Sequence, residues 1–143
     1  MTQARLGSAL FAEMGVPSPI PVGSFMDVFP YSVITQATLD QLSQLNPSAH
    51  FDVRRFRMNL VLHTSGTGFT ENAWVGRGLS IGDGVELSVT MPTPRCVMVT
   101  LPQTNLPPDL QVLKSLVHYN RLDIMGPGCF PVQVFIPVWK PKG

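Results

Sequence analysis

The sequence predicts an α+β fold, a small β-barrel-like domain with a few short helices. Three observations predict it. Several short segments have the composition and alternation of strands, few segments have helical periodicity, and 14 prolines with 12 glycines mark frequent turns. Many strands with few helices are typical of small barrels and of α+β domains. With 143 residues the chain is long enough for one core, so we expect a single domain over 1–143.

Three segments have the pattern of amphipathic helices, within 1–15, 35–46 and 107–120. In the second, Thr38 and Gln41 fit a capping box before an apolar stripe. In the third, Asp109 follows two prolines and is the expected N-cap. The apolar residues expected to face the core from these two helices are Leu39, Leu42 and Leu45, and Leu110, Leu113, Leu116 and Val117.

Five segments are predicted to form strands. They are 19–35, which reads as short strands with turns, then 54–64, 79–90, 95–101 and 130–139. The segment 79–90 has the pattern of a hairpin around Asp83 and Gly84. In 54–64 the alternation sets Arg55, Arg57 and Asn59 on one face of a strand, with apolar residues on the other.

Charge and composition exclude several classes of protein. The net charge is +1, so no bulk attraction to nucleic acid is expected. The most apolar late stretch, within 126–139, is too short and too rich in proline to span a bilayer. The first residues carry Arg5 and Glu13 and do not resemble a secretory signal, so we expect a soluble, cytoplasmic protein that binds no membrane.

Metal-ligating residues are few and scattered. The two cysteines, Cys96 and Cys129, form neither a disulfide framework nor a CxxC pair. His50, His63 and His118 lack the spacing of metal ligands, so no zinc is expected.

Cys96 is the first candidate for chemistry, because it directly follows Arg95. A guanidinium beside a thiol favours the thiolate, which is a soft metal ligand and a carrier of sulfane sulfur. The neighbours Val97 to Val99 are apolar, however, and free cysteine is commonly buried and inert. On these residues alone, a buried small hydrophobe is the favoured interpretation.

The alternating face of Arg55, Arg57 and Asn59 is the second candidate, since two guanidinium groups and an amide form a fork for phosphate or a planar heterocycle. A solvated strand face explains the same spacing equally well. Thr35 and Thr38 stand at a predicted strand-to-helix junction, where hydroxyl and backbone N–H groups can hold a phosphate. Ordinary N-capping is the favoured role for at least one of them.

Together these motifs resemble the MOSC domain, the module found at the C-terminal end of molybdenum cofactor sulfurases and in amidoxime-reducing proteins. The resemblance covers roughly residues 17–124. The motifs that carry it, in chain order, are "PYSVITQATL", "RRFRMNLVL", "GFTENAWVGRGLSIG", "PTPRCVMVTLPQ" and "VLKSLVHYN".

The resemblance implies a role with the molybdenum cofactor (molybdopterin) or in sulfur transfer, with a sulfur donor or redox protein as a partner. Cys96 matches the family's PRC cysteine, which ligates molybdenum or holds a persulfide, and it is therefore the expected catalytic residue and metal ligand. This match reverses the interpretation of Cys96 as an inert thiol. The expected cofactor-binding residues are Arg57, Asn59, Arg95, Thr35 and Thr38.

Both ends of the chain depart from the family pattern, so we expect a barrel that is incomplete within one chain. An incomplete sheet with an apolar last segment, "VQVFIPVW", leaves edges that another chain must cover. We therefore expect a homodimer or higher homo-oligomer. The alternative function is a non-catalytic binding or assembly module that keeps the scaffold and has lost the cofactor.

Overall fold

The computed structural model describes residues 31–122 and the strand 132–139. The predicted helix within 1–15 and the predicted strands before residue 31 lie outside the described residues. Described strands form one mixed sheet in the order β2-β1-β5-β4-β3. The strands are β1 (Val33–Thr35), β2 (Leu60–Leu62), β3 (Gly78–Ile81), β4 (Val85–Pro94) and β5 (Val132–Trp139).

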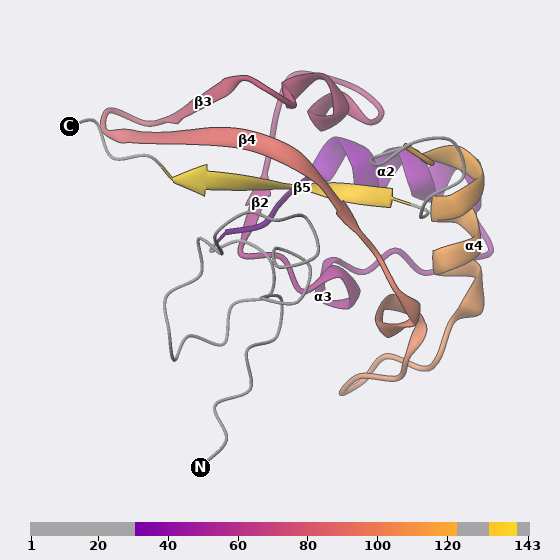
Figure 1. The fold of residues 1–143 in the computed structure, drawn as a ribbon. Coiled ribbons are helices and arrows are strands. Elements are labelled where there is room, and N and C mark those ends of the chain that lie inside the picture. The colour runs from indigo at the N-terminus through magenta and orange to yellow at the C-terminus, as the bar shows by residue number, and fades with distance from the viewer. Residues whose placement is uncertain (1–30, 123–131, 140–143) are drawn as a thin grey trace, which may run out of the picture.

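Three α-helices and two 3-10 helices complete the described fold. They are α2 (Gln36–Leu45), α3 (Val53–Phe56) and α4 (Leu110–Tyr119), with η1 (Thr70–Trp74) and η2 (Val97–Thr100). Figure 1 shows α2 and α4 at one end of the sheet, with the β3–β4 hairpin extending away from them. The expectation of an α+β fold is confirmed in this coarse form. No closed barrel is confirmed, because the sheet formed by the described strands is open, with β2 and β3 at its edges.

The hairpin and the last strand form as the sequence predicts. β3 and β4 are antiparallel, with Ile81 opposite Val85, and Gly82 in the turn has a positive φ of 58° that suits a residue without a Cβ. β5 is not an exposed edge, since it pairs with β4 on one side and with β1 on the other. The argument for a dimer from an uncovered last strand is therefore wrong, and the oligomeric state stays a prediction.

Two segments predicted as strands begin with helical turns instead. In 54–64 the chain forms α3, and only Leu60–Leu62 is extended. Asp52 caps α3 by accepting a hydrogen bond from the Arg54 backbone N–H, and Arg57 ends it in the left-handed conformation. In 95–101 the residues after Cys96 form η2, which buries Val99 while Val97 is exposed. Alternation of apolar and polar residues resembles a strand in sequence, but the contacts that bury Arg55, Phe56 and Val99 come from distant parts of the chain.

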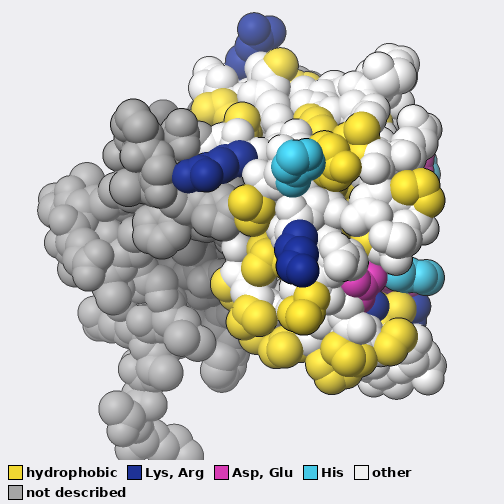
Figure 2. Space-filling view, turned by 90° about the vertical axis from the view of Figure 1, so that its right-hand side faces the viewer, with side chains coloured by type: hydrophobic (Ala, Val, Ile, Leu, Met, Phe, Trp, Pro, Cys, Tyr) yellow, Lys and Arg dark blue, Asp and Glu magenta, His cyan; other side chains and the backbone are white. Residues whose placement is uncertain are grey.

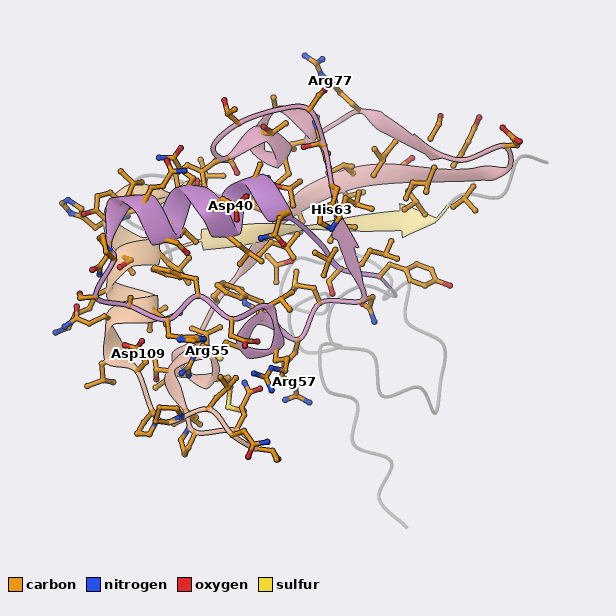
Figure 3. All side chains as sticks on the ribbon, turned by 180° about the vertical axis from the view of Figure 1, so that it is seen from behind. Asp40, Arg55, Arg57, His63, Arg77 and Asp109 are labelled. Atoms are coloured by element: carbon orange, nitrogen blue, oxygen red, sulfur yellow. The ribbon has the colours of Figure 1, made fainter. Side chains whose placement is uncertain are left out.

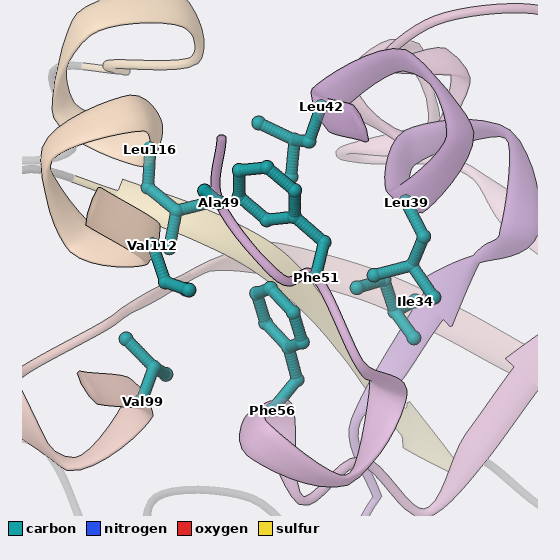
Figure 4. Close-up of a cluster of buried hydrophobic side chains, with 9 residues drawn as sticks. All are labelled: Ile34, Leu39, Leu42, Ala49, Phe51, Phe56, Val99, Val112 and Leu116. Atoms are coloured by element: carbon teal, nitrogen blue, oxygen red, sulfur yellow. The ribbon is translucent and has the colours of Figure 1, made fainter. Parts of the chain in front are cut away.

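The hydrophobic core lies where α2, α3, α4 and η2 meet β1. Figure 4 shows its side chains converging from these elements, with Phe51 and Phe56 between α2 and α4. Phe56 is fully buried, so the short helix α3 is anchored to the core by its last residue. The members of this cluster are Ile34, Leu39, Leu42, Ala49, Phe51, Phe56, Val99, Val112 and Leu116.

Helices α2 and α4 form close to where they are predicted, with two differences. The N-cap of α2 is Thr35, whose hydroxyl accepts from the Thr38 N–H at 3.1 Å, so the capping box at Thr38 is wrong. Asp109 caps α4 as expected. The stripe of α4 expected to face inward is right only in part. Leu116 is buried and Leu113 packs against the core, but Leu110 is 64% exposed, and the other buried residues are Val112 and Ser115.

A pair of identical substitutions on α4 tests which face packs on the core. We expect Leu116→Ala to lower the free energy of unfolding by about 2–5 kcal/mol, because it opens a cavity in a filled core. Leu110→Ala should change it by less than about 0.5 kcal/mol, since the side chain is exposed. Urea unfolding measures both. Equal losses would mean that Leu110 packs inward after all.

Candidate functional site around Cys96

The thiol of Cys96 lies at the surface. Cys96 is a free, exposed cysteine at the start of η2, where its backbone is extended and is not yet helical. The interpretation of a buried, inert thiol is therefore wrong. Its sulfur can meet a reagent, a ligand or a partner from solvent, which a role in ligation or sulfur transfer requires.

Arg95 ties the segment before Cys96 to the end of α3. Its Nη2 donates a hydrogen bond of 2.5 Å to the backbone carbonyl of Phe56, a residue 39 positions away in the sequence. The Arg95 side chain is only partly exposed. The guanidinium therefore has a positioning role: it fixes the PRC segment against a helix that is itself anchored in the core.

Arg57 directly follows Phe56, the residue whose carbonyl accepts the hydrogen bond from Arg95. It ends α3 with φ 51° and ψ 42°, and its backbone N–H donates to the Arg54 carbonyl at 3.2 Å. The side chain is exposed, and Figure 3 shows it at the edge of the molecule, pointing away from Arg55. The hydrogen bond from Arg95 to Phe56 thus brings Arg57, Arg95 and Cys96 into one neighbourhood.

Arg55 does not belong to this neighbourhood, so the prediction of one face shared by Arg55, Arg57 and Asn59 is wrong. Arg55 is fully buried, and its Nε and Nη2 donate to the carbonyls of His50 and Pro107 at 3.1 and 2.7 Å. It joins α3 to the chain that leads into α4. Successive residues of a helix are rotated by about 100° around its axis. Alternate residues therefore do not share a side as they would on a strand.

The side chain of Asn59 forms its hydrogen bonds with another part of the same chain. Its Oδ1 accepts hydrogen bonds from the backbone N–H and the hydroxyl of Ser32, at 2.9 and 2.8 Å. The backbone N–H groups of Asn59 and Leu60 donate to the Ser32 carbonyl in return. Asn59 therefore fixes the point where the parallel strands β1 and β2 begin, on the chain that continues directly from Arg57.

Thr35 and Thr38 are buried at the junction of β1 and α2. The Thr35 hydroxyl donates to Glu71 Oε2 at 2.7 Å, and its backbone N–H lies 3.5 Å from Oε1 of the same carboxylate. The Thr38 hydroxyl donates to the Gly68 carbonyl at 3.4 Å. Both hydroxyls are thus engaged with the segment 68–71.

Glu71 is the residue that sequence reasoning missed. Its carboxylate is 1% exposed and holds the start of α2 to η1 through Thr35. A buried carboxylate must be hydrogen-bonded to be tolerated, and Thr35 provides two donors. A single glutamate in a polar loop gives no sequence signal of burial, so nothing in the spacing could have identified it.

The carboxylate of Asp52, the N-cap of α3, has a lowered pKa. Arg54 binds Asp52 through two hydrogen bonds, from Nε at 2.8 Å and from Nη2 at 2.7 Å. This side-chain pairing is the main reason that the pKa of Asp52 lies well below its usual range, and the same pair raises the pKa of Arg54. The pair sits beside the cap of the helix that presents Arg57.

Metal ligands do not cluster in the described part of the chain. Among residues 31–122 and 132–139, no group of three or more His, Cys, Asp or Glu side chains is arranged to hold a metal ion. The same residues include no helix long and apolar enough to cross a membrane.

The described residues thus form a small α+β scaffold that carries an exposed thiol, Cys96, directly after Arg95. The family model of the MOSC domain matches residues 22–126 of this chain. The chain therefore belongs to the MOSC domain family, as its PRC and RFR-x-N motifs indicate. A search of curated proteins gives no match.

The Asp52–Arg54 pair gives a testable dependence on pH. Because the pKa of Asp52 is lower in the folded chain, its ionised form stabilises the fold above about pH 4, the value of an unfolded aspartate, and this contribution fades as the pH falls further. Asp52→Asn, which keeps a capping side chain, should therefore be less stable than wild type at pH 7 and approach it near pH 2. Urea unfolding across this range measures the difference. A difference that stays constant from pH 7 to pH 2 would contradict the assignment.

Proposed function

We propose that this MOSC domain binds the molybdenum cofactor or carries sulfane sulfur, and that Cys96 is the residue through which it does so. The observation that carries the proposal is the exposed thiol of Cys96 beside Arg95, whose guanidinium is hydrogen-bonded to the residue before Arg57. Membership of the MOSC domain family supports the choice of cofactor.

The residues around Cys96 fit such a group by their chemistry. A thiolate is a soft ligand, suited to molybdenum and to sulfane sulfur. Arg57 is exposed, so its guanidinium is open to an anion such as the phosphate of a pterin cofactor. Arg95 holds the thiol in place relative to Arg57. When bound, the cofactor would supply the redox or sulfur chemistry of the metal centre.

The other predicted residues have positioning roles in this proposal. Asn59 holds the chain after Arg57 to Ser32, and Thr35 and Thr38 hold the start of α2 to the segment 68–71. The hydrogen bonds between Asn59 and Ser32 lie at the start of the parallel pair β1 and β2 and support its register. They would affect the cofactor indirectly, through the placement of Arg57.

Sulfur carriage needs only a thiolate and a donor persulfide. The Cys96 thiolate attacks the outer sulfur of a donor R–S–SH, a new S–S bond forms on Cys96, and the donor's S–S bond breaks. The donor leaves as the thiolate R–S⁻, and Cys96 becomes Cys96–S–SH, with no net oxidation or reduction.

Protein made in a host that produces the cofactor tests the proposal. We expect molybdenum and pterin, or cyanide-releasable sulfur, in the purified chain. Cys96→Ser should lose the metal or the sulfur, because the sulfur atom that holds it is gone, while Cys129→Ser should keep it. Elemental analysis, pterin fluorescence after denaturation and cyanolysis are the measurements. Absence of all three from the wild-type chain would favour the alternative of an assembly module that has lost the cofactor.

Arg57→Ala tests the anion contact separately from the thiol. Loss of one charge-assisted hydrogen bond, about 1.5–3 kcal/mol, corresponds to roughly 10- to 100-fold weaker cofactor binding. Arg77→Ala is the matched control, because Arg77 is equally exposed and lies before β3. Equal weakening by both substitutions would show a general effect of charge and no specific contact.

A further inference from the structure

Helix α4 carries a second apolar stripe, of which the core uses only part, since Leu113 also packs against the core cluster. Val112 and Leu116 face the core, whereas Leu110, Leu113 and Val117 follow one another at intervals of three and four residues. Leu110 is 64% exposed. The part of this stripe that stays open to solvent, above all Leu110, is available to another molecule.

This second stripe borders a groove of about 860 Å³ between α4 and η2, here called the α4 groove. Val97 of η2, 52% exposed, lies on its other side. Figure 2 faces the side of the molecule that carries α4 and shows hydrophobic side chains gathered around basic and histidine side chains. The lining residues that the argument uses are Val97, Leu110, Leu113, Lys114, Val117 and Arg121.

The charges of the α4 groove have a single sign. Lys114, His118 and Arg121 line it, and no carboxylate does among the described residues. Asp109, at the start of α4, has its two oxygens engaged by the backbone N–H groups of Gln111 and His50. An occupant that complements this surface must combine apolar side chains with carboxylates.

We propose that the α4 groove docks a helical segment of a partner protein, with leucine-like residues on one face and Asp or Glu beside them. Binding of a helix in a groove is a common mode of recognition. The groove then contacts residues of the bound helix at intervals of three and four. Since Val97 directly follows Cys96, the docked partner would lie next to the thiol. The docking itself does not depend on the proposed function of Cys96.

Two other occupants fit less well. Membrane surfaces are bound by clusters of four to eight basic residues, whereas this groove has two and a histidine, in a chain of net charge +1. A second copy that paired through the same face about a two-fold axis would bring Lys114 and Arg121 of both copies close together, which is unfavourable. A partner with carboxylates avoids both difficulties.

Two synthetic peptides of about 14 residues test the proposal. Both are blocked at their ends and carry leucines at helical spacing; one has glutamates beside the leucines and the other has lysines. The acidic peptide should bind, shift the backbone amide NMR signals of α4 and η2, and bind roughly tenfold tighter than the basic one. No binding of the acidic peptide at millimolar concentration, or equal affinity for the two, would overturn the proposal.

Substitutions locate the binding surface. Leu110→Ser and Lys114→Glu should each weaken the acidic peptide by roughly tenfold, and Lys114→Glu should improve binding of the basic peptide. Val85→Ser and Arg77→Glu, exposed residues of the β3–β4 region, should change neither. Cys96→Ser should leave peptide binding intact, so that docking and thiol function are separable. Equal losses in the control variants would overturn the assignment of the surface.

Two further results would assign a different occupant to the α4 groove. Binding of wild type, but not Leu110→Ser, to phosphatidylserine vesicles with no binding of the acidic peptide would make it a membrane contact. Conversion of an oligomer to a monomer by Leu110→Ser, seen by light scattering, would make it an interface between copies of this chain. Either result overturns docking of an acidic partner.

Discussion

The hydrogen bond from Arg95 to the Phe56 carbonyl is the contact on which the candidate site depends. Phe56 is fully buried in the core, so its backbone is a fixed point. Arg95 connects that point to the segment that begins η2, and Cys96 is the next residue. Arg57 directly follows Phe56, at the acceptor end of the same hydrogen bond. Core packing therefore sets the placement of both the thiol and the exposed guanidinium.

The backbone of Arg57 shows what this arrangement costs. Arg57 has a positive φ of 51°, a conformation in which residues other than glycine are uncommon. For a residue with a Cβ, the left-handed region costs about 1–2 kcal/mol. A glycine would end α3 at lower cost, but it would carry no guanidinium. An exposed arginine kept in this conformation is consistent with the anion contact proposed for Arg57.

The elements with strong local signals could be predicted from the sequence. Asp109 after two prolines marks the start of α4, and the turn at 82–84 marks the β3–β4 hairpin. The short helix α3 and η2 could not be predicted, because Arg55 and Val99 gain their burial from distant partners. The Pro107 carbonyl that accepts from Arg55 is 52 positions away. Burial of Glu71 depends likewise on a threonine 36 positions earlier.

The site was predictable as a set of residues and not as a geometry. The PRC motif identified Arg95 and Cys96 as candidates, and both lie within the segment that matches the family model. Alternation suggested that Arg55 works beside Arg57, but the fold gives Arg55 a structural role in the interior. The apolar residues of α4, Leu110, Leu113, Leu116 and Val117, were all expected to face the core, but Leu110 is exposed. The packing of Val112 and Leu116 decides which face of α4 meets the core.

The central claim is that the Cys96 thiol and the Arg57 guanidinium belong to one surface that binds an anion. The most direct measurement compares the alkylation rate of Cys96 by iodoacetate, an anion, with that by neutral iodoacetamide, in a Cys129→Ser background. The account predicts that the ratio of the two rates falls several-fold in Arg57→Gln and also falls as salt screens the charge. A ratio that is the same in wild type and Arg57→Gln, and is insensitive to salt, would contradict it.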